Sequence, residues 1–196
     1  MNRNRDVFSA AVLALAIAVP GCGGDSSPAE TAAGPISPRD MADALYAVIE
    51  SDRTVYANQV VHRLQDEEAV IAASEHWRDE KALPLPAQMF RMGAELTAGK
   101  TDRFSYALLS KWPIQKTNAP KTEMELAGLD QVAEDPSRPF YGTETLGGVD
   151  YFTAVYPDIA VSPACIACHN AHKDSPRDDF EPGDTMGGVV IRIPLR

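Results

Sequence analysis

Cysteine and histidine are scarce in this chain, which has three cysteines and four histidines among 196 residues. The sequence contains no second C-x-x-C pair and no H-x-x-x-H pair, so the usual pattern of a structural zinc site is incomplete. Three is also an awkward number of cysteines for an exported protein that depends on disulfides. We therefore expect no disulfide framework in this protein.

Long apolar segments and an excess of positive charge are also missing. The apolar run of residues 7–19 has 13 residues, whereas a membrane-spanning helix needs about 20. The chain has 18 basic and 28 acidic side chains, which gives a formal charge of −10 at pH 7. This charge makes nucleic acid and anionic lipid headgroups poor partners. It would attract a positively charged partner protein, although solubility alone explains an acidic surface equally well.

The N-terminus has the pattern of a bacterial export signal. Arg3 and Arg5 precede the apolar run, and Cys22 follows it closely. Residues 19–22 resemble a lipobox, in which Cys22 would be lipidated and become the mature N-terminus. Pro20 departs from the small or branched residue usual there. Ordinary cleavage nearby, which would leave Cys22 as a free thiol, is therefore the alternative.

These signals divide the chain into three predicted parts. Residues 1–21 are predicted to be a lipoprotein-type signal peptide, and residues 22–38, rich in Gly, Ser, Pro and Ala, a flexible tether. Residues 39–196 are predicted to form the folded domain. The lipid would anchor the protein on the periplasmic side of a bacterial membrane. The outer membrane is favoured, because Gly23 does not resemble an inner-membrane retention signal.

Helical patterns fill the first part of the predicted domain. Ser37-Pro38 marks a helix start, and apolar residues at one-face spacing predict a helix from residue 39. A second helical pattern extends toward the prolines at positions 84 and 86 through five apolar residues: Val60, Val61, Leu64, Val70 and Ile71. Residues 87–99 and 123–133 predict two further helices.

Strand patterns follow the helices. Strands are predicted at residues 104–109, 140–144, 150–161 and 187–195, with a hairpin turn at Gly147-Gly148. In the last strand Val189, Ile191 and Ile193 would share one face. Helices that precede strands favour an α+β fold with an antiparallel sheet over an alternating βαβ arrangement.

The segment Cys165-Ile166-Ala167-Cys168-His169 has the most specific chemistry in the chain. Two thiols three positions apart can each add to one vinyl group of a single porphyrin, and the next histidine then lies beneath the iron. Cys165 and Cys168 are therefore predicted to be thioether anchors of one covalent haem c. His169 is predicted to be the proximal iron ligand. With Cys22 lipidated, these uses account for all three cysteines.

Three alternatives exist for the cysteine pair. A thioredoxin-like motif needs a strand before it and a helix after it, whereas Ser162-Pro163 precedes this pair and polar residues follow it. Zinc could be held by both cysteines, His172 and one remote histidine. A disulfide within the pair would close only a very small loop, which limits its stabilising effect.

Several segments in a fixed order resemble the PAS-like c-type haem domain family, long catalogued as a domain of unknown function. The resemblance covers about residues 40–196 and implies a PAS-like sheet preceded by long N-terminal helices, with one covalent haem near the C-terminus. Family members occur as free-standing exported cytochromes and as sensory modules. The segments are Phe104-Ser105-Tyr106, Leu109-Ser110, Trp112-Pro113-Ile114, Asn118-Ala119-Pro120, Glu123, the haem pentapeptide with Asn170, Ser175-Pro176, and Gly183-Asp184-x-x-Gly187.

The resemblance leaves the sixth iron ligand open. One branch of the family uses a cysteine on the first long helix, and this chain has no cysteine there. We rank His76 first, because neutral imidazole is a common iron ligand. Helical phase places His62 almost opposite the apolar face, which is typical of a solvated side chain. His172 could support the site from the proximal side. The alternatives to His76 are an exchangeable ligand or water, His62, Tyr56, Met89 and Met92.

These expectations favour a monohaem c-type cytochrome that carries one electron between periplasmic redox partners, with a basic docking surface on the partner. The alternative is a haem-based redox or gas sensor that acts through a separate partner protein, because this chain has no output module. An enzyme such as a peroxidase is less favoured, because we can name no distal acid or base.

Replacing both motif cysteines, Cys165→Ala with Cys168→Ala, should abolish covalent haem, because no thiol then remains at the motif to form a thioether. Haem staining after denaturing electrophoresis measures this loss. A red band that survives in the double variant would contradict the attachment site.

Overall fold

A long helix begins the part of the chain that the computed structural model describes, residues 34–160 and 162–195. α1 (Pro38–Val55) starts as predicted at Ser37, whose hydroxyl accepts the Asp40 N–H at 3.1 Å. It continues directly into η1 (Tyr56–Glu67), a π-helical segment. The predicted signal peptide, Cys22 and most of the tether lie outside the described residues.

The second predicted helix is confirmed at Val60, Val61 and Leu64, which lie in η1. Its expected continuation through Val70 and Ile71 was wrong, because η1 ends at Glu67. Ala69 takes a left-handed φ of 52°, and the Val70 N–H returns to the Leu64 carbonyl at 2.8 Å. A left-handed residue followed by such a back-reaching hydrogen bond is a common way to end a helix. Glycine usually supplies that conformation, so an alanine gave no signal in the sequence.

Short elements connect the long helix to the sheet. β1 (Ala73–Ser74) pairs in parallel with β2 (Leu83–Pro84), and α2 (Trp77–Glu80) lies between them in the chain. α3 (Pro86–Ala98) confirms the helix predicted at residues 87–99, with Gly99 at its C-cap. None of the helices in the described ranges is long and apolar enough to span a membrane.

Four antiparallel strands form the main sheet, in the order β3-β6-β5-β4. They are β3 (Ser105–Leu109), β4 (Phe140–Leu146), β5 (Val149–Ile159) and β6 (Thr185–Pro194). The predicted hairpin is confirmed: Gly147 and Gly148 connect β4 to β5 with φ of 59° and 81°, a conformation that suits glycine. The predicted α+β fold with an antiparallel sheet is therefore confirmed.

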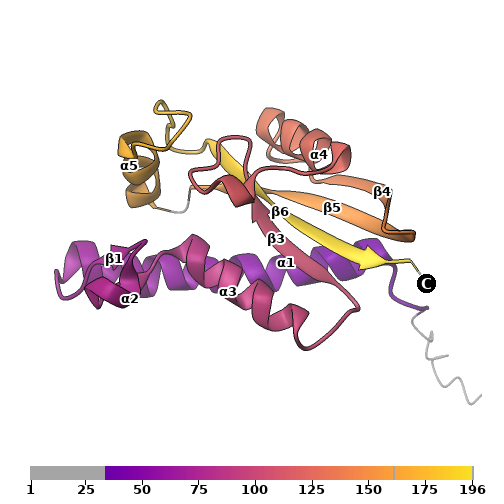
Figure 1. The fold of residues 1–196 in the computed structure, drawn as a ribbon, viewed down its shortest axis with the longest axis horizontal. Coiled ribbons are helices and arrows are strands. Elements are labelled where there is room, and N and C mark those ends of the chain that lie inside the picture. The colour runs from indigo at the N-terminus through magenta and orange to yellow at the C-terminus, as the bar shows by residue number, and fades with distance from the viewer. Residues whose placement is uncertain (1–33, 161, 196) are drawn as a thin grey trace, which may run out of the picture. The chain divides into compact units, whose positions relative to one another are not determined.

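Helices cover both faces of this sheet (Figure 1). α1 and α3 pack on one face, and α4 (Glu123–Glu134), the helix predicted at residues 123–133, packs on the other. Val189, Ile191 and Ile193 of β6 belong to the core cluster on the α1 side, as their alternation predicted. Val190 belongs to the cluster on the α4 side. β6 is thus buried on both faces, between its neighbours β3 and β5.

Candidate functional site

The C-x-x-C-H motif lies on a helix that follows the end of β5. α5 (Pro163–Ala171) carries Cys165, Cys168 and His169. Residues three and four apart on a helix lie on the same face, so the two thiols and the imidazole share one side of α5. Both cysteines are free; Cys165 is half-buried and Cys168 is exposed. This arrangement suits two bonds and one ligand to the same planar group.

The helical conformation of the motif corrects one step of the sequence argument. We argued against a thioredoxin-like motif from Ser162-Pro163 before the pair and polar residues after it, yet the pair lies within a helix, α5, that follows the predicted strand β5. Of the polar residues after the pair, Asn170 still lies in α5, and Lys173 and Asp174 follow its end. A thioredoxin-like site is tied to a parallel βαβ unit. Here α5 connects two antiparallel strands, β5 and β6, so the topology does not match that alternative.

His169, the predicted iron ligand, has a partly buried imidazole. Burial lowers the pKa of its imidazole, and the nearby Asp158 opposes this shift only in part. A lowered pKa keeps the ring neutral at pH 7, which is the form that binds iron. Its Nδ1 is buried and has no hydrogen-bond partner among the described residues. The ring edge meets Phe180 at 5.8 Å between centroids and 88° between planes.

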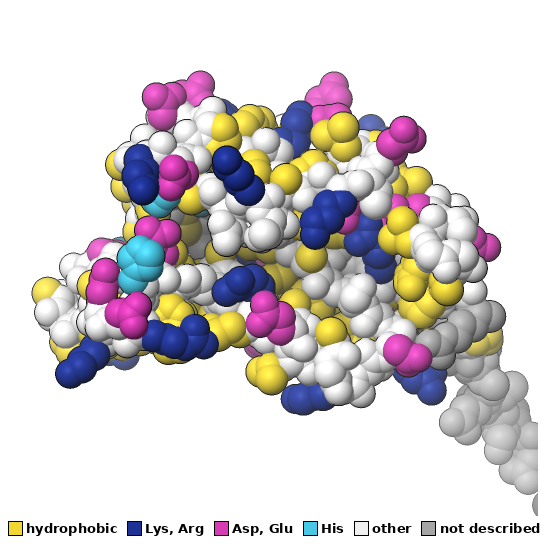
Figure 2. All heavy atoms as spheres, viewed as in Figure 1, with side chains coloured by type: hydrophobic (Ala, Val, Ile, Leu, Met, Phe, Trp, Pro, Cys, Tyr) yellow, Lys and Arg dark blue, Asp and Glu magenta, His cyan; other side chains and the backbone are white. Residues whose placement is uncertain are grey.

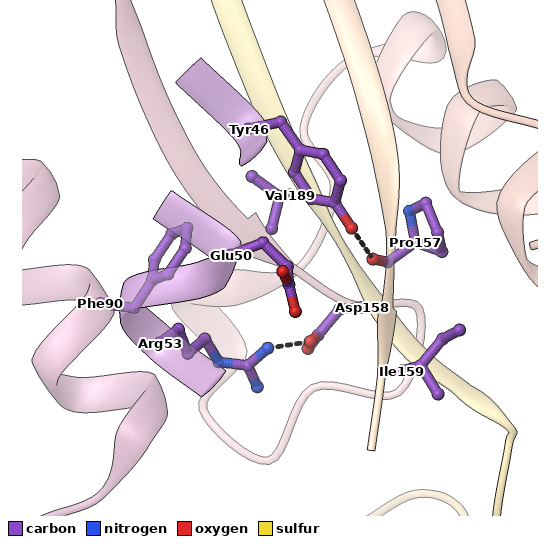
Figure 3. A pocket seen from close by; sticks show the side chains of 8 residues that line it. All are labelled: Tyr46, Glu50, Arg53, Phe90, Pro157, Asp158, Ile159 and Val189. Atoms are coloured by element: carbon purple, nitrogen blue, oxygen red, sulfur yellow. Dashed lines mark hydrogen bonds and ion pairs between the residues drawn. The ribbon is translucent and has the colours of Figure 1, made fainter. Parts of the chain in front are cut away.

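A buried ion pair joins α1 to the end of β5 (Figure 3). Arg53 of α1 donates a hydrogen bond to Asp158 of β5, and their side chains are 11% and 9% exposed. Burial alone would lower the pKa of Arg53, but Asp158 raises it above its ordinary value. Cys165, the first motif cysteine, also raises the pKa of Arg53, so it lies within electrostatic range of that side chain.

The pocket around this ion pair is too small to enclose a haem. It measures about 90 Å³, whereas sites for drug-sized ligands measure roughly 300–1,000 Å³. The Tyr46 hydroxyl donates to the Pro157 carbonyl at 3.1 Å in the same pocket, and burial raises the pKa of Tyr46 to about 12. None of the residues that line this pocket belongs to the motif. The two free thiols and the imidazole on one face of α5 fit a haem that is attached by covalent bonds.

Among the described residues, Glu75 links His76, the first-ranked candidate for the sixth ligand, to the end of α5. It is the N-cap of α2, beyond the long helix, and its Nε2 lies 3.5 Å from an oxygen of Glu75. The same oxygen lies 3.7 Å from Nε2 of His172, which follows α5. In the space-filling view, histidine and acidic side chains gather where α5 faces the β1–α2 segment (Figure 2). The His76 side chain is 67% exposed.

The other candidates for the sixth ligand make contacts elsewhere or are packed on α3. His62 of η1 pairs with Asp66 at 2.8 Å, in agreement with its expected solvated position. The Tyr56 hydroxyl donates to the Pro84 carbonyl at 2.8 Å. Met89 and Met92 are half-buried on α3.

For the zinc alternative, the described residues contain no group of three His, Cys, Asp or Glu side chains that could hold a metal ion.

Sequence reasoning missed Arg53, Asp158 and Phe180. Arg53 had a signal: it follows Leu45 and Ile49 at four-residue spacing, so a charged side chain stands on the apolar face of the first helix. A charge on a buried face needs a partner. The partner, Asp158, lies 105 residues away in the chain, and no local pattern identifies it.

Known proteins resemble this chain over most of its length. A protein-family model for Tll0287, described as Tll0287-like, matches residues 36–194. The crystal structure of the cyanobacterial haem protein Tll0287 matches with a TM-score of 0.52 and 16% sequence identity, covering 82% of this chain and 98% of that one. At this identity the structural match shows a shared fold. None of the curated proteins matches significantly.

Asp158→Asn should destabilise the protein by about 3–5 kcal/mol, because it leaves the buried Arg53 charge unpaired. Urea unfolding measures the free energy of unfolding. Asp130→Asn is the matched control, since Asp130 pairs with Lys111 but is 52% exposed, and exposed pairs contribute about 0–1 kcal/mol. Equal destabilisation by the two variants would contradict a buried, energetically demanding pair.

Proposed function

Because this chain belongs to the Tll0287-like family of haem proteins, we propose that it is an exported monohaem c-type cytochrome that carries one electron between periplasmic redox partners. The observation that carries the proposal is the placement of Cys165, Cys168 and His169 on one face of α5. The two thiols would add across vinyl groups to form thioethers, and the neutral imidazole of His169 would bind the iron. Bound there, the haem supplies one-electron redox chemistry.

The exposure of the motif supports electron transfer. Cys168 is exposed while His169 is partly buried, so a group bonded to both would have one edge toward solvent and its ligand inside the protein. A partner protein could approach that edge closely. We propose that the antiparallel sheet with helices on both faces is a PAS-like scaffold. Its hydrogen-bonded strands would keep the iron ligand, His169, in place during reduction and oxidation.

The proposed partner and location follow from charge and from the N-terminal signal. A formal charge of −10 favours a redox partner with a basic docking surface. Acidic and basic side chains are intermixed on the face in Figure 2, so this attraction would come from the net charge of the protein. A lipid on Cys22 would hold the domain at the periplasmic side of a membrane, with the outer membrane favoured.

A second candidate function is a haem-based redox or gas sensor that acts through a separate partner protein. One observation favours it: the His76 side chain, ranked first as sixth ligand, is 67% exposed. A ligand held so loosely could be displaced by a small gas. The resulting shift of the β1–α2 segment would then be the signal.

Carbon monoxide should leave the visible spectrum of the reduced protein unchanged, because His76 would occupy the sixth position. His76→Ala should make the spectrum respond to carbon monoxide by opening that position. His62→Ala is the matched control and should behave as the wild type, since His62 pairs with Asp66 at the surface of η1.

A carbon monoxide response in the wild type would refute a closed sixth site and favour the sensor. If neither the wild type nor His76→Ala responds, a different side chain ligates the iron, and the assignment of His76 is wrong.

A further inference from the structure

Phe180 packs against the imidazole that we assign to the iron. It lies in the segment between α5 and β6, and its side chain is 3% exposed. Its ring meets the His169 ring edge-on, at 5.8 Å and 88°. Phe180 and His169 are eleven residues apart, so the segment after α5 folds back onto its own helix.

Asn170, the residue directly after His169, holds Phe180 in that place. Its side-chain Nδ2 donates to the Phe180 carbonyl at 2.9 Å, and its Oδ1 accepts the Phe180 N–H at 2.9 Å. Two reciprocal hydrogen bonds fix both the distance and the orientation of the Phe180 backbone relative to α5. Asn170, the residue next to His169, therefore fixes the backbone from which the Phe180 ring projects.

Arg177 closes the outer side of this arrangement. Its guanidinium lies over the Phe180 ring at 4.2 Å and over the Trp112 ring at 4.9 Å. Two carboxylates hold the guanidinium: Asp184 at 2.7 Å and Asp179 at 2.6 Å. Asp184 belongs to the Gly183-Asp184 signature found in the sequence, and Gly183 supplies the turn with a φ of 96°.

His169 has an unusual need for such support. A histidine that binds metal almost always donates its other ring N–H to a carboxylate, a carbonyl or water, which orients the ring and raises its basicity. The Nδ1 of His169 is buried and has no hydrogen-bond partner in the part of the chain that the structure describes. Packing must then do what the hydrogen bond usually does.

We propose that Asn170, Phe180 and Arg177 form a clasp that orients the His169 imidazole and keeps water away from its Nδ1. This inference rests on the proposed haem attachment. All three are positioning residues. With Nδ1 shielded, the imidazole is a weaker electron donor to the iron, which favours the reduced state. Opening the clasp lets water accept the Nδ1 proton in a hydrogen bond and lowers the midpoint potential.

The test uses the haem-loaded protein and its Phe180→Ala variant. We expect the variant to keep its covalent haem, because both cysteines remain. At the wild-type midpoint potential, its ratio of oxidised to reduced protein should rise by about threefold or more. Its electron paramagnetic resonance spectrum should change, because the imidazole plane is no longer fixed. Phe180→Leu, whose smaller side chain leaves part of the space beside the imidazole open to water, and Asn170→Ala should shift both readouts in the same direction.

Leu129→Ala is the matched control, because Leu129 is 1% exposed and packs in the cluster on the α4 side of the sheet. It should lower the melting temperature to a similar extent and leave both the potential and the spectrum at their wild-type values. If Phe180→Ala does not fold, Phe180→Leu and Asn170→Ala decide the question.

Wild-type potential and spectrum in these variants would overturn the clasp while leaving the haem assignment intact. A wild-type protein with no covalent haem would instead overturn the proposed function itself. The same shifts in Leu129→Ala would show that they report general loosening of the fold, and would also overturn the clasp.

Discussion

The end of the β5–β6 ladder is the constraint on which the site depends. Asp158 pairs with Gly187 and Ile159 with Thr185, and the register shifts between these two pairs. The chain therefore leaves the sheet and returns to it at the same place, with α5 and the clasp between the two strands. Gly187 is needed there, because a Cβ would lie 2.4 Å from the Leu109 carbonyl oxygen. Because both of its ends are fixed, the segment that carries α5 has a defined position beside the sheet.

Two side-chain contacts bring other elements to this segment. Arg53 joins α1 to Asp158 at the irregular end of the ladder, and Glu75 lies between His76 and His172. The first pair is buried and carries a desolvation cost that only its good pairing offsets. The second contact is exposed and contributes little energy. The α1 side of the site is therefore held by a buried pair, and the β1–α2 side by exposed contacts.

Local chemistry predicted much of the fold and the centre of the site. The helix start at Ser37, the hairpin at Gly147 and the alternation in β6 each follow from a few adjacent residues, and all are confirmed. The family resemblance is confirmed by the match to residues 36–194. The helical conformation of α5 was not predicted. The helix end at Glu67 was missed, because a left-handed alanine sets it. Arg53 and Phe180 act through contacts between distant segments, which spacing cannot show. The lipidation of Cys22 stays a prediction.

The most direct test of the central claim is the intact mass of the mature protein, produced in a host that can mature c-type cytochromes. We expect the mass of the polypeptide plus one haem, retained under denaturing conditions, because thioethers from Cys165 and Cys168 survive unfolding. A mass equal to the polypeptide alone, in a host that loads a known c-type cytochrome in parallel, would contradict the account.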